Sequence, residues 1–264
     1  MTHTLEVRDI SHRYGTDDSA NLVLSNLNFH ADAGEFVSFV GPSGCGKSTL
    51  FNIITGLLAP SEGSVLVDGV ETTGQPTRKI GYVLQKDLLM PWRTVMRNVV
   101  LGLEVHGVPK AEATERARAL FAEYHLEGVE NKFPAQLSGG MRQRAALMRT
   151  MVTEPEIVLM DEAYKALDYP LKIQLESELM ENVKKSGKTV VFVTHDIEEA
   201  VTLSDRVYVL KAHPGEIVEE IRIDLGTDSP RINERRLATP FNDYYEHIWR
   251  SIGTAPARNE EKAA

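Results

Sequence analysis

The chain has 264 residues, of which 42% are hydrophobic and 25% charged, the balance of an ordinary soluble globular protein. That length suits one large domain or a domain with an embedded subdomain. The formal net charge of -9 argues against the basic face typical of nucleic-acid-binding proteins, so we expect no nucleic acid partner.

Cysteine usage and apolar run length bear on where the protein works. Cys45 is the only cysteine, which rules out an intramolecular disulfide and favours a reducing compartment. The segment Met1–Ile10 lacks the apolar core of a signal peptide. No apolar run approaches the ~18 residues that crossing a bilayer requires. We therefore expect that another chain holds this protein at a membrane, if it works at one.

Apolar patterning predicts an α/β fold. Short or alternating apolar runs predict strands at Leu5–Ile10, Phe36–Val40, Val65–Val67, Ile80–Leu84, Ile157–Met160, Val190–Val193 and Val207–Leu210. Helical patterning predicts helices at Ser48–Gly56, Thr94–Val105, Lys110–Tyr124, Gly140–Val152, Leu171–Lys185 and Ile197–Ser204. The mostly helical block 89–153 predicts an insertion in the α/β core. Turn-forming Gly226–Pro230 predicts a linker between residues 1–225 and a short C-terminal extension, 226–264, which holds one amphipathic helix at Phe241–Ile252.

A glycine-rich segment, Gly41-Pro-Ser-Gly-Cys-Gly-Lys-Ser48, fits the phosphate-binding loop (P-loop) pattern. It joins a predicted strand to a predicted helix, the context that the motif requires. The glycines let backbone N–H groups turn toward phosphate oxygens, and the helix N-terminus adds a favourable dipole. A turn that merely joins a strand to a helix is the alternative. We predict nucleotide binding, with Lys47 at the β- and γ-phosphates and Ser48 on Mg²⁺. The predicted nucleotide-binding residues are Gly41, Pro42, Ser43, Gly44, Cys45, Gly46, Lys47, Ser48 and Thr49.

Two acids end the apolar strand that begins at Ile157. A buried strand delivers Asp161 to the metal side of the phosphates, where its carboxylate can hold Mg²⁺ through water. Glu162, one residue further on, can orient or deprotonate an attacking water molecule. A strand that happens to end in an acidic loop is the alternative. The P-loop upstream favours the catalytic interpretation.

The segment Leu137-Ser-Gly-Gly-Met-Arg-Gln143 resembles the signature of ABC ATPases, the ATP-hydrolysing subunits of ABC transporters. Ser138, Gly139 and Gly140 open a predicted helix and so form a second anion-binding helix end. The resemblance implies that this end serves the ATP bound by a second copy of the chain, so that two copies enclose two ATP molecules head to tail. Ser138 as a simple helix cap is the alternative.

The resemblance extends from about Leu5 to Asp224 and assigns four more residues. Gln85 is similar to the residue that contacts Mg²⁺ and senses the transmembrane partner. Asp168 lies in a segment similar to the loop that links the two ATP sites, and His195 resembles the histidine that contacts the γ-phosphate. Tyr14 lies where the family places an aromatic ring on adenine, although a surface turn is the alternative there. The fold implied is a P-loop core with an antiparallel N-terminal sheet and an inserted helical subdomain.

The stretch Leu88-Leu-Met-Pro-Trp-Arg-Thr-Val95 resembles one seen in ATPases of nitrate, sulfonate and taurine importers. In that family this region faces the membrane subunit, and Trp and Arg suit a docking surface. Packing of Trp92 inside its own subdomain is the alternative. One departure is Ala163-Tyr-Lys165, where most relatives carry Pro, an aromatic residue and a small residue, which leaves the coupling of the two sites open.

The sequence therefore predicts an Mg·ATP-hydrolysing subunit of an ABC importer for small oxyanions. We expect it to lie peripherally on the cytoplasmic face of the membrane, bound to integral permease subunits. A periplasmic or extracellular solute-binding protein would act with it indirectly. The alternative is a soluble ABC ATPase that powers cofactor or iron–sulfur cluster assembly, and the Pro-Trp-Arg-Thr stretch speaks against it.

Overall fold

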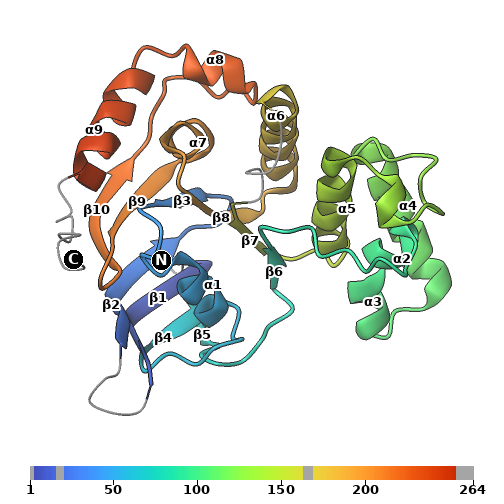
Figure 1. Ribbon diagram of the computed structural model, residues 1–264, viewed down its shortest axis with the longest axis horizontal. Helices are drawn as coiled ribbons and strands as arrows, with labels where there is room; N and C mark the ends of the chain where they lie inside the picture. The colour runs from blue at the N-terminus through green and yellow to red at the C-terminus, as the bar shows by residue number, and fades with distance from the viewer. Residues whose placement is uncertain (1–2, 16–20, 163–168, 254–264) are drawn as a thin grey trace, which may run out of the picture.

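The computed structural model describes residues 3–15, 21–162 and 169–253, and it contains two β-sheets and a separate group of helices (Figure 1). The first sheet is antiparallel, in the order β2-β1-β4-β5. Its strands are β1 (Leu5–Tyr14), β2 (Asn21–Ala31), β4 (Glu62–Val67) and β5 (Val70–Glu71). This sheet confirms the antiparallel N-terminal sheet expected from the resemblance.

The second sheet has six strands in the order β10-β9-β3-β8-β7-β6, and only β10 runs antiparallel to its neighbour. Its strands are β3 (Phe36–Val40), β6 (Ile80–Val83), β7 (Ile157–Asp161), β8 (Thr189–Thr194), β9 (Arg206–Lys211) and β10 (Glu216–Arg222). Every residue of β3 and β8 is buried, as parallel strands covered on both faces require.

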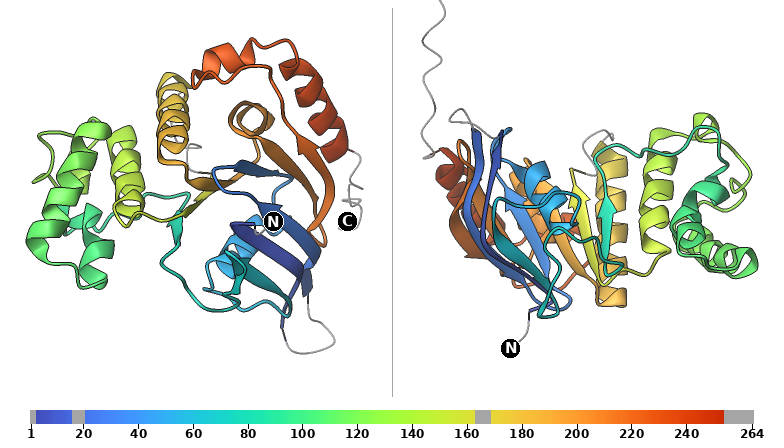
Figure 2. Two further views of the ribbon diagram at one scale, coloured as in Figure 1. Left: turned by 180° about the vertical axis from the view of Figure 1, so that it is seen from behind. Right: turned by 90° about the horizontal axis from the view of Figure 1, so that it is seen from below.

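Side chains alternate between the two faces of this sheet. Leu159 and Val191 pack with α1 (Lys47–Ile54) and the antiparallel sheet. Val158 and Phe192 pack with α6 (Tyr169–Ser186) and the inserted helices on the other face. Figure 2 shows the antiparallel sheet and α1 on one side of the central strands and α6 on the other. The carboxyl ends of the parallel strands therefore share one edge, beside the start of α1.

The inserted helices lie to one side of the sheets (Figures 1 and 2). They are α2 (Val95–Val99), α3 (Leu101–Val105), α4 (Lys110–Glu123) and α5 (Gly139–Met151), with a 3-10 turn at Pro134–Gln136. The prediction of one helix at Thr94–Val105 was wrong in detail. Val100, with φ -77° and ψ 0°, ends α2 and begins α3.

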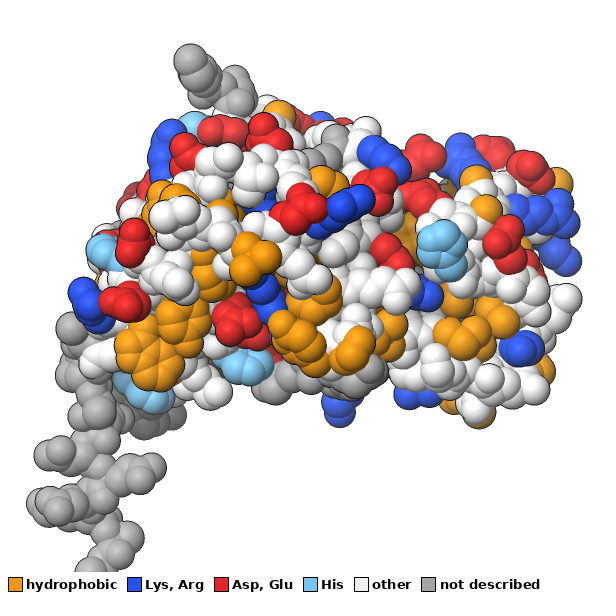
Figure 3. Space-filling model, turned by 90° about the horizontal axis from the view of Figure 1, so that it is seen from above, with side chains coloured by type: hydrophobic (Ala, Val, Ile, Leu, Met, Phe, Trp, Pro, Cys, Tyr) orange, Lys and Arg blue, Asp and Glu red, His pale blue; other side chains and the backbone are white. Residues whose placement is uncertain are grey.

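The last described helices gather beside β9 and β10. Helices α7 (Ile197–Leu203) and α9 (Phe241–Gly253) share a buried cluster with these strands, and Ile248 of α9 is fully buried against α7 and β9. Helix α8 (Ile232–Arg236) packs against α7 and α6. Seen from above, hydrophobic patches lie between charged side chains of both signs (Figure 3). No helix among the described residues is long and apolar enough to cross a membrane.

Helix α6 carries a fully buried carboxylate, Glu176. Lys172 Nζ lies 3.8 Å from its Oε1, and Arg236 Nη2 of α8 lies 3.7 Å from its Oε2. Within the described ranges neither carboxylate oxygen has a hydrogen-bond partner. Burial, together with the nearby Glu199 carboxylate, raises the pKa of Glu176 to about 8, so the folded protein keeps a proton there at neutral pH.

Glu176→Gln is expected to stabilise the protein relative to wild type at alkaline pH. The unfolded chain loses the proton near the ordinary pKa of 4.5, whereas the folded chain keeps it up to about 8. The wild-type free energy of unfolding therefore falls as the pH rises through this interval, by roughly 2–5 kcal/mol. Denaturant unfolding at pH 5 and pH 8.5 measures the effect. An equal difference between variant and wild type at both pH values, as expected for exposed Glu181→Gln, contradicts the assignment.

Candidate nucleotide site

The P-loop turns sharply between β3 and α1. Gly46 is the N-cap of α1 and has a left-handed backbone, with φ 88°. A Cβ at this position would lie 2.4 Å from Leu24 Cδ2, so only glycine fits. The turn leaves Ser43 and Gly44 exposed at the N-terminus of α1, where backbone N–H groups favour an anion.

Lys47 stabilises the P-loop through hydrogen bonds to its backbone. Its ammonium group donates hydrogen bonds to the carbonyl oxygens of Gly41 at 2.7 Å and Pro42 at 3.0 Å. It also lies 3.4 Å from Cys45 Sγ, and burial raises the pKa of that thiol. The Lys47 side chain is nevertheless positioned at the wall of the neighbouring cavity. It can therefore turn its charge to a phosphate that enters there.

A cavity of about 430 Å³ lies where the strand ends meet the P-loop. The predicted residues from β3, β6 and β7 converge on it because parallel strands present their carboxyl ends at one edge. Its lining residues are Val23, Ser43, Gly44, Gly46, Lys47, Ser48, Thr49, Gln85, Asp161 and Glu162.

Asp161 and Ser48 form the hard-oxygen part of this cavity. Ser48 Oγ donates a hydrogen bond to Asp161 Oδ2 at 3.1 Å, and Tyr82 Oη lies 3.5 Å from the same oxygen. Burial raises the pKa of Asp161, and the neighbouring Glu162 charge acts in the same direction. A hydroxyl and a carboxylate oxygen side by side are ligands that Mg²⁺ prefers, so the residues present fit this ion.

Glu162 joins two other predicted residues. Gln85 Nε2 donates to Glu162 Oε2 at 2.9 Å, and His195 Nδ1 lies 3.1 Å from Glu162 Oε1. The Glu162 backbone has φ 44°, and its N–H donates to the carbonyl of Val193 in β8 at 2.9 Å. This strained backbone aims the carboxylate between Gln85 and His195, an arrangement suited to holding a water molecule.

Tyr14 ends β1 beside the P-loop. Its hydroxyl group lies 3.4 Å from Thr49 Oγ1 of α1, and its side chain is half exposed. Its ring packs edge-on against His12, with 4.6 Å between centroids. The structure therefore places an accessible aromatic ring beside Thr49, a residue that lines the cavity.

Comparison with known proteins decides the family. The family model described as ABC transporter matches residues 24–165. An uncharacterized ABC transporter ATP-binding protein of Methanocaldococcus jannaschii is 46% identical over 94% of this chain and 91% of its own length. The taurine import ATP-binding protein TauB of Pseudomonas putida is 39% identical over 84% of each chain. The chain belongs to the ABC transporter family.

A solved structure supports the same assignment. The ATP-binding cassette MJ0796, a dimer in a post-hydrolysis state bound to ADP and Pi, is 34% identical. It covers 83% of this chain and 99% of its own, with a TM-score of 0.73. The present chain is thus an ATP-binding ATPase of the ABC family, and the predicted P-loop core with an antiparallel sheet and an inserted helical subdomain is confirmed.

The signature segment of this ABC ATPase lies apart from its own P-loop. Ser138 caps α5, accepting a hydrogen bond from the Met141 N–H at 3.3 Å. Ser138 and Gly139 are exposed, while Gly140 packs so closely on α6 that a Cβ would lie 2.3 Å from Leu171 Cδ2. None of the three lines the P-loop cavity. Asp168 and the departure at 163–165 lie outside the described residues.

The loop after Gln85 is tied to the signature helix by two arginines of α5. Arg142 Nε lies 3.0 Å from Asp87 Oδ2. Arg149 donates to the carbonyl oxygens of Asp87 and Leu88, at 2.7 and 2.8 Å. Trp92 is 74% exposed, so the alternative that it packs inside the helical group was wrong. The loop is thus fixed on one side and open on the other.

Sequence reasoning missed two residues at this site. Val23 lines the cavity from β2, a strand that was not predicted. Gly215, just before β10, contacts the back of the P-loop and exchanges backbone hydrogen bonds with Val23 and Ser25. A Cβ on Gly215 would lie 2.1 Å from the carbonyl oxygen of Cys45.

Gly215→Ala is expected to push the P-loop out of position. We expect a loss of about 1–3 kcal/mol in the free energy of unfolding and weaker ATP binding, because backbone must move to admit the methyl group. Denaturant unfolding and nucleotide titration measure both effects. Gly253→Ala is the matched control, since a Cβ there meets nothing within 4 Å. Wild-type ATP affinity in Gly215→Ala contradicts this role.

Proposed function

We propose that this chain is the energy-coupling subunit of an ABC importer for small oxyanions such as nitrate, an alkanesulfonate or taurine. The observation that carries the importer role is the open loop that follows Gln85, a residue of the cavity lining, because Leu88 and Trp92 of this loop are exposed. Large exposed apolar side chains at a fixed loop suit a protein partner. The likeness to a taurine import ATP-binding protein supports a small sulfonate as the solute.

In this proposal ATP is hydrolysed by a water molecule that Glu162 orients and deprotonates. The water oxygen attacks the γ-phosphorus, the bond to the β-phosphate oxygen breaks, and ADP and phosphate leave. Lys47 and His195 stabilise the negative charge on the γ-phosphate, and Gln85 holds the Glu162 carboxylate in line. Ser48, Gln85 and Asp161 would hold Mg²⁺, which would neutralise charge on the phosphates.

A second copy completes each site. Ser138, Gly139 and Gly140 of one copy, with Asp168, serve the ATP held by the P-loop of the other, in a head-to-tail pair. Ser138 and Gly139 are exposed at the start of α5 and do not line the cavity of their own P-loop, which supports this arrangement. Tyr14 stacks on adenine at the open side of each cavity.

The pair acts on integral permease subunits from the cytoplasmic face of the membrane, as a peripheral protein. Residues 1–225 form the ATPase domain. Block 89–153 carries Trp92 of the loop that contacts the permease, and it also carries the signature. Residues 226–264 form a short extension. Closure around ATP drives the permease between its access states, and a periplasmic or extracellular solute-binding protein selects the oxyanion.

The test is co-purification from gently solubilised native membranes, comparing wild type with Trp92→Ala. We expect a polytopic membrane protein to co-purify with wild type, and its recovery to fall at least about tenfold in the variant, the scale of a hot-spot residue. Basal ATPase activity of the isolated subunit should not change. Trp249→Ala, which removes an exposed tryptophan of α9, is the matched control.

The outcomes separate the levels of the proposal. Recovery only from the soluble fraction with a cofactor or iron–sulfur scaffold would overturn the transport role and leave the ATPase intact. A co-purifying solute-binding protein would then be titrated with nitrate, taurine and an alkanesulfonate. Binding of none of the three would overturn the solute class alone.

A further inference from the structure

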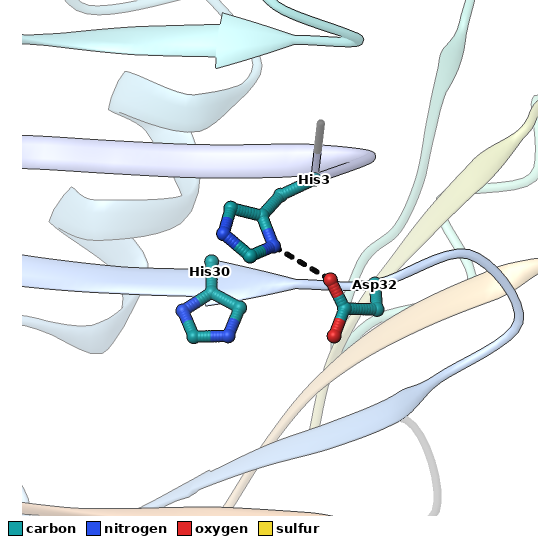
Figure 4. A group of neighbouring side chains, drawn as sticks. All are labelled: His3, His30 and Asp32. Carbon is teal, nitrogen blue, oxygen red and sulfur yellow. Dashed lines mark hydrogen bonds and ion pairs between the residues drawn. The ribbon is translucent and has the colours of Figure 1, made fainter. Parts of the chain in front are cut away.

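Three potential metal ligands lie together at the end of the antiparallel sheet, outside the nucleotide cavity (Figure 4). His3 precedes β1, His30 lies in β2, and Asp32 follows β2. The antiparallel register, which pairs Leu5 with Ala31, brings these three positions together. Their polar groups come from two separate strand ends rather than from one loop.

The ligand atoms of these three side chains lie close enough together to bind one metal ion after side-chain adjustment. His3 Nδ1 lies 2.6 Å from Asp32 Oδ1, and the two imidazole centroids are 4.0 Å apart. One ligand atom from each residue can be chosen so that all lie within 4.8 Å of one another. Two ligands on a tetrahedral zinc ion are about 3.3 Å apart, given bonds of about 2.0 Å. The side chains of His3 and Asp32 are partly exposed and have room to rotate toward this spacing.

The surrounding charge favours a divalent cation. Arg206 donates to His30 Nε2 at 2.7 Å, but it is also paired with Glu35 at 2.8 Å and Glu220 at 3.1 Å. Four carboxylates and two guanidinium groups around the cluster leave two negative charges. These groups are Glu6, Asp32, Glu35, Glu220, Arg8 and Arg206.

His30 presents an acceptor nitrogen to its surroundings, because its Nε2 lies 2.7 Å from Arg206 Nη1, a group that can only donate. Arg206 donates to Nε2, so this nitrogen carries the lone pair. If the ion takes this lone pair, Arg206 keeps its carboxylate partners.

We propose that His3, His30 and Asp32 form a binding site for a transition-metal ion of the zinc class. Two imidazoles and one carboxylate are a donor set that zinc accepts, with a fourth position left to water. The ion would fasten the start of β1 to the end of β2. This site is separate from the hard-oxygen Mg²⁺ site at Ser48 and Asp161, and it does not depend on the transport role.

The test is Co²⁺ titration of the full chain after treatment with a chelator, followed by competition with Zn²⁺. We expect one equivalent to bind with a visible absorption band of tetrahedral type, which Zn²⁺ abolishes. His3→Ala and His30→Gln should each weaken Co²⁺ binding at least about tenfold, because even the loss of an outer-shell partner of a metal ligand costs this much. His3 lies at the chain end outside the core, so its variant tests the site without threatening the fold.

Two controls locate the ion. His247→Ala removes an exposed histidine that pairs with Glu219 and should bind Co²⁺ as wild type does. His195→Ala removes the histidine of the nucleotide site and should also retain the band. Loss of the band in His195→Ala but not in His3→Ala would assign the ion to the nucleotide site and overturn the proposal. Equal affinity in wild type and His30→Gln, or no tetrahedral band, would overturn it as well.

Discussion

Glu162→Gln is expected to lower ATP hydrolysis by at least about 100-fold, the usual contribution of a positioned general base. Glu162 is held between Gln85 and His195 by a left-handed backbone. An amide in its place has the same size and can still accept from Gln85 Nε2, but it cannot take a proton from water. Because ATP still binds, the variant should accumulate an ATP-bound dimer that wild type forms only transiently. Phosphate release and size-exclusion chromatography with Mg·ATP measure the two effects.

The matched control is Glu156→Gln, which changes an exposed carboxylate next to the opposite end of β7. It should hydrolyse ATP as wild type does, because its charge lies away from the cavity. If Glu162→Gln remains monomeric with Mg·ATP and hydrolyses at the wild-type rate, Glu162 is not the base.

Lys47→Met is expected to weaken ATP binding by about 10- to 100-fold, the effect of removing a hydrogen-bonded charge. Methionine keeps the length and apolar stem of the buried side chain. It also loses the hydrogen bonds to the carbonyls of Gly41 and Pro42, so the P-loop should become less stable even without nucleotide. Nucleotide titration and thermal unfolding of the free protein measure the two losses separately.

Lys185→Met serves as the control, since Lys185 is an exposed residue of α6 paired only at the surface, with Glu181. It should bind ATP normally. Unchanged ATP affinity in Lys47→Met would contradict the phosphate role of Lys47. A normal thermal transition together with weak binding would contradict only its role in holding the empty loop.

The P-loop and the catalytic strand were predictable because their signals are local. Phe36–Val40 is observed as predicted, and the strand from Ile157 extends by only one residue. Buried parallel strands are continuous apolar runs, and the loops that follow carry fixed spacings of glycine, lysine and acid. Sequence spacing also indicated which residues share an edge of the sheet.

The strands that were missed lack such local signals. In β2 the backbone at Asn26 is left-handed, with φ 47°, and the register with β1 shifts three times, so the apolar alternation is broken. In β10 most of the residues are charged or only partly buried, because it is an edge strand. Short α8 depends on tertiary contacts such as the buried Arg235, which donates to the carbonyl of Thr202.

Within the site, chemistry was predictable and conformation was not. Nothing in the residue types around Glu162 announces a left-handed backbone, which arises because its N–H is held by β8. The closeness of Gly215 to Cys45 depends on β10 returning beside β2, a contact between segments far apart in the sequence. The exposure of Trp92 likewise needed the packing of α2 and α5 to be known.

The two arginines of α5 have a mechanical consequence. Arg142 in the first half of α5 and Arg149 in its last turn both bond to the loop after Gln85, so we expect this loop and α5 to move together. In the proposed head-to-tail pair, a displacement of this loop in one copy would therefore move the signature segment that contacts the ATP of the other copy. The two ATP sites of the pair would then respond together. A mixed dimer in which one copy lacks the Arg142 and Arg149 contacts would lose hydrolysis at the ATP site that this copy's α5 serves in the other copy.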